Sequence, residues 1–224
     1  MKYAVIGAGH MGRVVATQLP KDAQRLIVDT DLSAAERLAA ETGAAASSTL
    51  ADAADADLIA IVVPAHAVEP VVRALAACAK GGSVLMNMST NGLIPPELPT
   101  AHPELHFVNS KIIGEAAAIL GGAPTYVLTD ATEPALFARV QQALPGYTKV
   151  LQADPALVGR INTAATEEGI RAAVNVRKAL ADLDLPSDWV NIAISTVCAG
   201  SMRAYAEGRL GDFGNRLAEQ LEGN

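Results

Sequence analysis

The chain of 224 residues has little of several residue types that define large classes of proteins. Its two cysteines, Cys78 and Cys198, show no CxxC spacing, so we expect neither a disulfide framework nor a zinc site and interpret both as small core residues. The four histidines have no metal-ligand spacing, so no metal is implied. Aromatic residues make up 4% of the chain whereas half of it is hydrophobic, which favours helices packed closely on a sheet.

Basic residues are also scarce, and long apolar runs are missing. The formal net charge is −7, and no run of Lys and Arg could follow a phosphate backbone, so we expect no nucleic-acid partner. The longest apolar stretch, LIAIVV at 58–63, is far shorter than the roughly 20 residues that span a bilayer. The first residues have a strand pattern without a signal peptide. We therefore expect a soluble, cytoplasmic protein without a membrane partner.

Short apolar segments alternate with helix-like segments along the first two thirds of the chain. This βαβ rhythm predicts a doubly wound, mostly parallel sheet of the Rossmann type, in a domain that covers residues 1–153. The predicted strands are residues 2–7, 25–29, 57–63, 83–89, 105–110, 124–129 and 148–152. The predicted helices are residues 11–19, 33–41, 67–79 and 134–144.

The remaining segment, residues 154–224, has helical patterns alone. We expect helices over 155–183 and 188–207 and a short last helix. The helix over 188–207 carries apolar or small residues on most of its circumference, which is typical of a helix covered on more than one side. Because a tail of this size has few partners of its own, we expect a small helical domain that forms a homodimer and contributes to the substrate site. Cover by the long first helix and the Rossmann domain alone is the alternative.

Three glycines follow the first predicted strand in the sequence GAGHMG. Gly7, Gly9 and Gly12 match G-x-G-x-x-G between a strand and a helix, the context that a dinucleotide-binding turn requires. The first glycine would allow the tight turn, the second would let a pyrophosphate approach, and the third would let the helix pack closely. A turn that serves packing alone is the alternative. The predicted cofactor-binding residues of this turn are Gly7, Ala8, Gly9, His10, Met11 and Gly12.

An acidic residue ends the second predicted strand, about 20 residues after the glycines, as in dinucleotide-binding proteins. The carboxylate of Asp29 could accept hydrogen bonds from the adenosine ribose, and it would repel a 2′-phosphate. Asp31 adds negative charge, and the nearest following base, Arg37, already lies within a helix. The pattern favours NAD over NADP.

Three segments, AVIGAGHMG at 4–12, IVVPAHAVEPVV at 61–72 and VLMNMSTN at 84–91, resemble the 6-phosphogluconate dehydrogenase-like superfamily. This group includes β-hydroxyacid dehydrogenases, pyrroline-5-carboxylate reductases and deazaflavin-dependent NADP reductases. The resemblance covers residues 1 to about 153. It implies a Rossmann domain followed by helices that form much of a dimer.

The same resemblance implies further site residues. It places Val63 and Pro64 beside the cofactor, and Ser89, Thr90 and Asn91 near the nicotinamide. The expected fold independently supports this placement, because ligands of open α/β sheets bind outside the carboxyl ends of the strands, where Pro64 and Ser89 would lie. Capping of a helix or turn by Ser89 and Thr90 is the alternative.

The segment VGRINTAATEEG at 158–169 departs from the β-hydroxyacid dehydrogenases, which carry a lysine near the start of this helix. The nearest base, Arg160, stays protonated and is a poor general acid, although it can clamp a carboxylate. Arg160, Thr163 and Glu167 share one helix face with Arg171. A solvated surface stripe is the alternative for this face.

Another lysine offers acid or base chemistry. Lys111, in NSKIIGEAAAI, follows a predicted strand in a segment that resembles a loop and helix of pyrroline-5-carboxylate reductases. A desolvated lysine can have a pKa low enough for proton transfer, whereas surface exposure is the alternative. The candidate catalytic residues are Asn91, Lys111, Arg160 and Glu167.

The sequence thus predicts an NAD(P)-dependent oxidoreductase. It would transfer a hydride between the nicotinamide and a small-molecule substrate with a carbonyl, an imine or a deazaflavin. The alternative is a non-catalytic dinucleotide-binding redox sensor or regulatory subunit, which the missing lysine and the short helical tail favour.

Overall fold

The computed structural model describes residues 1–223, which form two compact units. The first unit is Met1–Asn162, and the second begins at Thr163, inside helix α7 (Ala156–Ala179). We predicted that the nucleotide-binding domain ends at residue 153, and this boundary between sequence domains stays a prediction.

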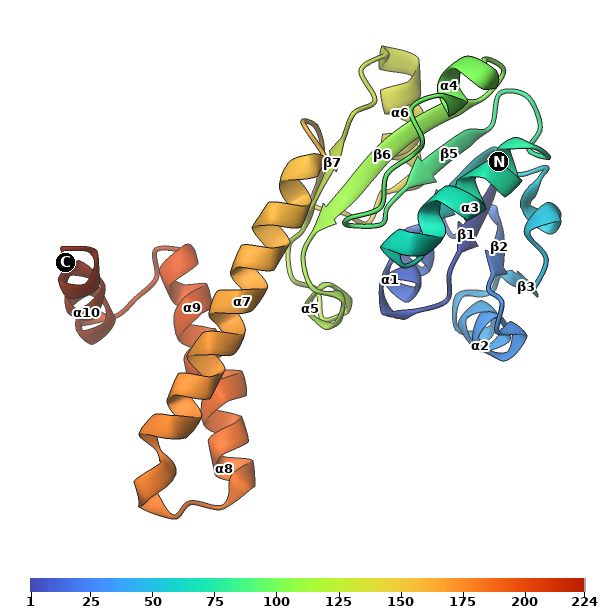
Figure 1. Ribbon diagram of the computed structural model, residues 1–224. Helices are drawn as coiled ribbons and strands as arrows, with labels where there is room; N and C mark the ends of the chain where they lie inside the picture. Colours follow the sequence, from blue (N-terminus) through green and yellow to red (C-terminus); the bar gives the residue numbers. More distant parts are fainter. Residues whose placement is uncertain (224) are drawn as a thin grey trace. The chain divides into compact units, whose positions relative to one another are not determined.

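The first unit contains one eight-stranded sheet with the order β3-β2-β1-β4-β5-β6-β7-β8 (Figure 1). All neighbouring strands are parallel except β6 and β7, which are antiparallel. The order of the first six strands is that of a Rossmann fold, which confirms the predicted fold class. The strands are β1 (Lys2–Ile6), β2 (Gln24–Val28), β3 (Ala45–Ser47), β4 (Leu58–Ile61), β5 (Val84–Asn87), β6 (His106–Ile113), β7 (Tyr126–Thr129) and β8 (Lys149–Gln152).

Helices cover both faces of this sheet. The crossover α3 lies in front of the sheet in Figure 1 and packs with η1 and α4 into one apolar layer. Helices α1, α2, α5 and α6 contribute to the opposite layer. The elements are α1 (His10–Gln18), α2 (Leu32–Thr42), η1 (Leu50–Ala53), α3 (Ala65–Ala76), α4 (Leu98–Ala101), α5 (Ala116–Leu120) and α6 (Pro134–Ala143).

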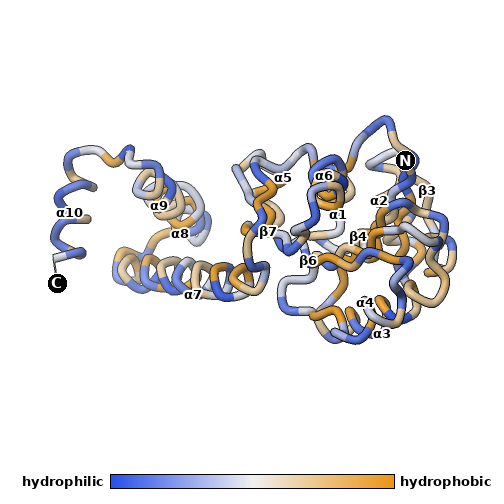
Figure 2. Tube along the Cα trace, turned by 90° about the horizontal axis from the view of Figure 1, so that it is seen from above, coloured by the Kyte–Doolittle hydropathy of each residue, from blue (hydrophilic) through white to orange (hydrophobic). Residues whose placement is uncertain are grey.

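The alternation of side chains along the strands explains the two layers. In β1, Tyr3 and Val5 are buried in one apolar cluster, whereas Ala4 and Ile6 are buried in the other. A strand that is buried on both faces needs an unbroken apolar run, as the first strand has. Figure 2 shows hydrophobic residues concentrated in the inner strands, such as β4 and β6.

Three expectations about the first unit were wrong in detail. β3 was not predicted, because its residues Ala-Ala-Ser lack the apolar character of a strand. β6 extends to Ile113, so Lys111 lies within the strand and not after it; pairing with β7 continues the strand beyond the predicted end. Cys78 is exposed and not in the core, because it lies two residues after the end of α3. Cys198, in the second unit, is half-buried.

The second unit contains the predicted helices and no buried residue in its described part. Its large apolar side chains include Trp189 and Phe213, which are 62% and 75% exposed. No helix in the part of the chain that the structure describes has the length and apolar character needed to cross a membrane. Besides the rest of α7, the elements are η2 (Ala181–Leu183), α8 (Ser187–Ile192), the π-helical η3 (Ala193–Cys198), α9 (Ala199–Ala206) and α10 (Asp212–Glu222).

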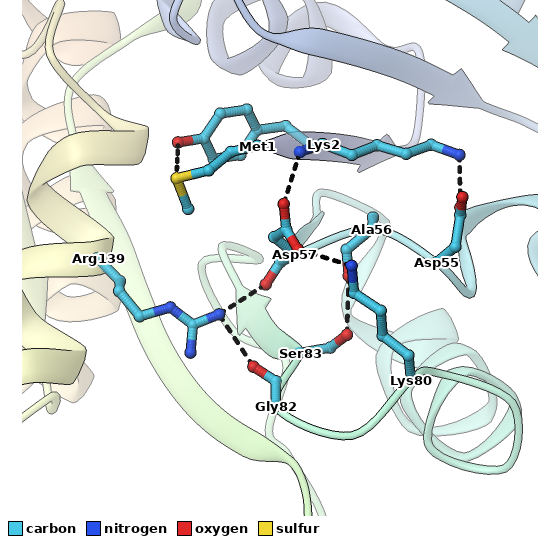
Figure 3. Close-up of polar contacts among 10 residues, drawn as sticks. Met1, Lys2, Asp55, Ala56, Asp57, Lys80, Gly82, Ser83 and Arg139 are labelled. Atoms are coloured by element: carbon cyan, nitrogen blue, oxygen red, sulfur yellow. Dashed lines mark hydrogen bonds and ion pairs between the residues drawn. The ribbon is translucent and has the colours of Figure 1, made fainter.

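Charged residues pair with one another at the amino ends of β1, β4 and β5 (Figure 3). The Asp57 carboxylate accepts hydrogen bonds from the Lys2 backbone N–H at 2.7 Å and from Lys80 Nζ at 2.6 Å. These bonds, led by that from Lys80, lower the pKa of Asp57. Arg139, from α6, donates to the Asp57 carbonyl at 2.9 Å. We call this set, Lys2, Asp57, Lys80 and Arg139, the amino-edge network.

Candidate functional site

The glycine turn joins β1 to α1 at the carboxyl edge of the sheet, and its three glycines have different environments. Gly7 has a φ of +108°, and a Cβ there would collide with the Val62 carbonyl. A Cβ on Gly12 would collide with the Gly7 carbonyl, so this glycine allows the helix to approach the turn. A Cβ on Gly9 would meet no atom within 4 Å. The fold therefore requires Gly7 and Gly12, whereas Gly9 faces open space.

The start of α1 supplies free hydrogen-bond donors next to this open space. Gly9 is the N-cap and offers no side chain, and the first turn contains no acidic residue. The first N–H groups of a helix lack intrahelical partners, and the helix dipole adds a partial positive charge there. The turn is therefore suited to bind an anion such as a pyrophosphate.

Asp29 lies directly after β2 and connects this strand end to the glycine turn. Its Oδ2 accepts a hydrogen bond from the Ala8 N–H at 2.7 Å, and its Oδ1 accepts one from the Asp31 N–H at 2.9 Å. An ionised carboxylate has about four acceptor sites, so both oxygens retain capacity for a ribose hydroxyl. Asp29 thus has two possible roles, in the turn and toward a nucleotide.

A groove of about 490 Å³ runs along the carboxyl ends of these strands. It brings together five predicted cofactor-binding residues. These are Gly7, Gly9, Asp29, Val63 and Pro64.

Among the other residues that line this groove, Thr30, Ser48, Leu50 and His66 were not predicted to bind the cofactor. Ser48 and Leu50 follow β3, so recognising that short strand would have indicated them. His66 lies in the first turn of α3 and was visible in the sequence, but nothing in its spacing separated it from a capping residue.

The other predicted residues of the turn lie on different sides of it. His10 is exposed and lines a second hollow with Arg13 and Arg37. Arg13 is held by Glu41 in an ion pair of 2.7 Å. Met11 is half-buried and packs against the core. The cofactor-binding roles of these residues stay predictions.

The loop after β5 contains the predicted nicotinamide-side residues. Ser89 is buried, and its N–H donates to Asn87 Oδ1 at 3.1 Å. Thr90 is half-buried, and Asn91 is exposed. These three residues follow the strand next to β4 and do not line the groove described above.

Lys111 is 3% exposed, which excludes the alternative of an ordinary surface lysine. Its Nζ donates hydrogen bonds to the carbonyl oxygens of Thr90 at 3.0 Å and of Gly92 at 3.1 Å. Burial lowers the pKa of Lys111, and the negative charges of Asp130 and Asp154 partly oppose this effect. The lysine is thus near the predicted nicotinamide loop, but its ammonium group already binds that loop.

The first turns of α7 also pack on this part of the first unit. A Cβ on Gly159 would lie 2.7 Å from Asn91 Oδ1, and Asn162 Nδ2 donates to the Ile112 carbonyl at 2.9 Å. Arg160 follows Gly159 and is exposed. The structure therefore brings the loop containing Asn91, Lys111 and the start of α7 together.

Glu167, the fourth candidate catalytic residue, belongs to the second unit. Its side chain is exposed, next to Arg171 and Ile170 along one face of α7. Arg171 forms its ion pair with Glu168 at 3.2 Å. The catalytic roles of Glu167 and of the other three candidates stay predictions.

Comparisons with known proteins agree with this architecture. The family model for the NAD-binding domain of 6-phosphogluconate dehydrogenase matches residues 2–97. An inferred oxidoreductase from Mycobacterium avium 104 is 27% identical, with a TM-score of 0.69 over 94% of this chain and 78% of that chain. No curated protein sequence matches the chain.

Two further solved structures share the fold at lower identity. A pyrroline-5-carboxylate reductase from Coxiella burnetii is 12% identical, with a TM-score of 0.73 over 98% of this chain and 84% of that chain. A reductive aminase from Aspergillus terreus, in complex with NADPH, is 19% identical, with a TM-score of 0.63 over 92% of this chain and 75% of that chain.

Proposed function

We propose that the chain is an NAD(P)-dependent oxidoreductase of the 6-phosphogluconate dehydrogenase-like superfamily and that it reduces a small carbonyl or imine compound or a deazaflavin. The dinucleotide would supply the hydride, and the reverse oxidation would use the same geometry. The protein residues would bind the cofactor, orient the substrate and stabilise charge on the reacting oxygen or nitrogen.

Gly9 carries this proposal. A glycine is required at positions 7 and 12 by the protein itself, but at position 9 no protein atom limits a side chain. A bound pyrophosphate would leave no room for a side chain at position 9, because it would lie against the backbone N–H groups at the start of α1. The residues present therefore fit a dinucleotide at this turn.

A matched pair of substitutions tests the proposal. Gly9→Val should leave the melting temperature near the wild-type value and abolish NADH binding, measured by the fluorescence of NADH. Gly12→Val should instead lower the melting temperature, because its side chain collides with the Gly7 carbonyl. Unchanged NADH affinity of Gly9→Val would refute a dinucleotide site at this turn.

The cofactor is NAD in this proposal. Asp29 borders the groove with a carboxylate that can accept a hydrogen bond from a ribose hydroxyl and that repels a 2′-phosphate. The Aspergillus terreus enzyme binds NADPH, so the fold alone is compatible with either cofactor. Titration of the wild-type protein with NADH and with NADPH separates them, and equal affinities would contradict the choice of NAD.

The reaction would take place where Asn91 and the start of α7 meet. Asn91 can donate a hydrogen bond to a developing charge, and the exposed Arg160 can bind a substrate carboxylate. Neither is a general acid of the lysine type, so the proton would come from water or from a group on the substrate. A panel of oxo acids, cyclic imines and deazaflavins, followed by NADH oxidation, tests the substrate class; absence of turnover with the whole panel would favour a binding protein.

A homodimer through the C-terminal helices is also part of the proposal. No described residue of the second unit is buried, and an apolar hollow opens between α9 and α10 at Met202, Tyr205, Phe213 and Leu217. A second copy would cover such surfaces. Light scattering at micromolar concentration should give twice 23.1 kDa, and a fully active monomer would contradict the dimer.

A further inference from the structure

We propose that Lys111 is a positioning residue that holds the loop 90–92 in place and thereby orients Asn91 at the carboxyl end of β5. This inference rests on the proposed function, because it gives the loop a task at the hydride-transfer end of a bound dinucleotide. The sheet order supports that location: the Asp29 end of the groove lies at β2, and β5 lies on the other side of β1 and β4.

Lys111 reaches the loop because β6 is longer than its neighbour. The last residue of β5, Asn87, is opposite Asn109, so Lys111 lies in the part of β6 that extends beyond β5. From there its Nζ binds the Thr90 carbonyl at 3.0 Å and the Gly92 carbonyl at 3.1 Å. These two carbonyls are on either side of Asn91. A single ammonium group therefore fixes the backbone before and after that residue.

The loop is held from two more directions. Asn87 Nδ2 donates to the same Gly92 carbonyl at 3.0 Å, and Asn87 Oδ1 accepts from the Ser89 N–H. In addition, a Cβ on Gly92 would collide with Val68 of α3, so the loop packs closely against this helix. The side chain of Asn91 is the exposed part of this otherwise fixed segment.

This geometry separates positioning from proton transfer. A proton donor must reach the substrate, whereas Lys111 is covered and its Nζ binds two carbonyls of the protein. Removing the ammonium group would leave the Thr90 carbonyl without this donor and free the loop to move. Lys111 therefore acts through Asn91 and not on the substrate.

The first test measures the loop without any cofactor. In Lys111→Met, amide hydrogen exchange over residues 89–92 should be about tenfold faster than in the wild type, because the loop opens more easily. Lys149→Met is the matched control, since Lys149 is an exposed lysine at the far edge of the sheet, and it should leave this segment unchanged. Unchanged exchange in Lys111→Met would overturn the proposal. If Lys111→Met does not fold, Lys111→Gln, which keeps an amide donor, replaces it.

The second test locates the effect along the dinucleotide. Lys111→Met should weaken NADH binding about tenfold and leave the affinity for ADP-ribose, which lacks the nicotinamide, within about twofold. A purely structural role would weaken both ligands alike, and that result would overturn the positioning role. In an Asn91→Ala background, Lys111→Met should cause little further loss, because the two residues act as a unit. A wild-type protein that binds neither ligand would refute the proposed function, while the exchange experiment would still decide whether Lys111 holds the loop.

Discussion

The two edges of the same sheet differ in how the chain treats its own polar groups. At the amino edge, the network of Lys2, Asp57, Lys80 and Arg139 pairs side-chain charges with each other and with backbone groups. At the carboxyl edge, α1 begins without a side-chain cap and Gly9 leaves open space beside its first N–H groups. The difference indicates that one edge stabilises the fold, while the other keeps donors available for a ligand.

The largest effect on the difference between the two edges is expected when a side chain of the protein itself accepts hydrogen bonds from the free N–H groups of α1. Gly9→Asp should place a carboxylate at the N-cap of α1, where it stabilises the helix by a few tenths to about 1 kcal/mol. The same carboxylate would occupy and repel the pyrophosphate site, so NADH binding should be lost. Thermal unfolding and NADH titration measure the two effects. Gly9→Ala is the control, and it should give no gain in stability; a variant that is more stable and still binds NADH would contradict the assignment of the site.

A smaller effect is expected at Asp29, which serves the turn and, in the proposal, the ribose. Asp29→Ala should weaken NADH binding by about 1 to 3 kcal/mol and reduce the preference over NADPH, because hydrogen bonds to a charged acceptor are lost. Asp31→Ala is the matched control: Asp31 accepts a hydrogen bond from the Ala34 N–H at the start of α2. That change should lower helix stability without changing the preference. Equal effects of both variants on NADH affinity would argue against a ribose contact.

At the amino edge, we expect a substitution to lower the stability of the fold without weakening NADH binding. Asp57→Ala should lower the free energy of unfolding by about 1 to 2 kcal/mol, because the Lys2 N–H and Lys80 lose their acceptor. NADH affinity should stay at the wild-type value. Denaturant unfolding and NADH titration check the pair of results, with Asp55→Ala as a control for an exposed ion pair. A large loss of NADH affinity in Asp57→Ala would remove the distinction between the edges.

The smallest expected effect is a dependence on pH at the same residue. The pKa of Asp57 is lower in the folded protein than in the unfolded chain, so its contribution to stability is present above the unfolded value of about 3.9. It is lost as the pH falls through the folded value. The stability difference between the wild type and Asp57→Asn should therefore be constant near neutral pH and shrink below about pH 4. A difference that grows on acidification would contradict the ion pairing.

The sequence predicted those parts of the fold that depend on residues close to one another in the chain. The apolar runs predicted the inner strands, and the spacing of Gly7, Gly9 and Gly12 predicted a turn whose geometry the structure shows. β3 has no such run, because Ala-Ala-Ser is small and depends on its neighbours for pairing. The extension of β6 over Lys111–Ile113 begins with a lysine and forms through pairing with β7.

The environment of Lys111 could not be predicted for a related reason. A lysine in a polar segment has the pattern of a surface residue, and its burial depends on carbonyl groups of Thr90 and Gly92, which are about 20 residues earlier in the chain. The sequence predicted Lys111 and Asn91 as candidate catalytic residues from the resemblance of two separate segments to known proteins. Their mutual arrangement required the pairing of β5 with β6.

The reversal of direction between β6 and β7 fixes the level at which the chain leaves the sheet before α7. β7 pairs only with the part of β6 that extends past β5, with Ser110 opposite Thr129, and Thr129 is in turn opposite Gln152 of β8. The chain is thus returned to the level of the β5 terminus before α7 begins. Because β7 runs back along β6, shortening both strands equally at the end where they are joined would leave Thr129 opposite Ser110. The antiparallel return therefore makes the level at which α7 begins independent of the length of the extension.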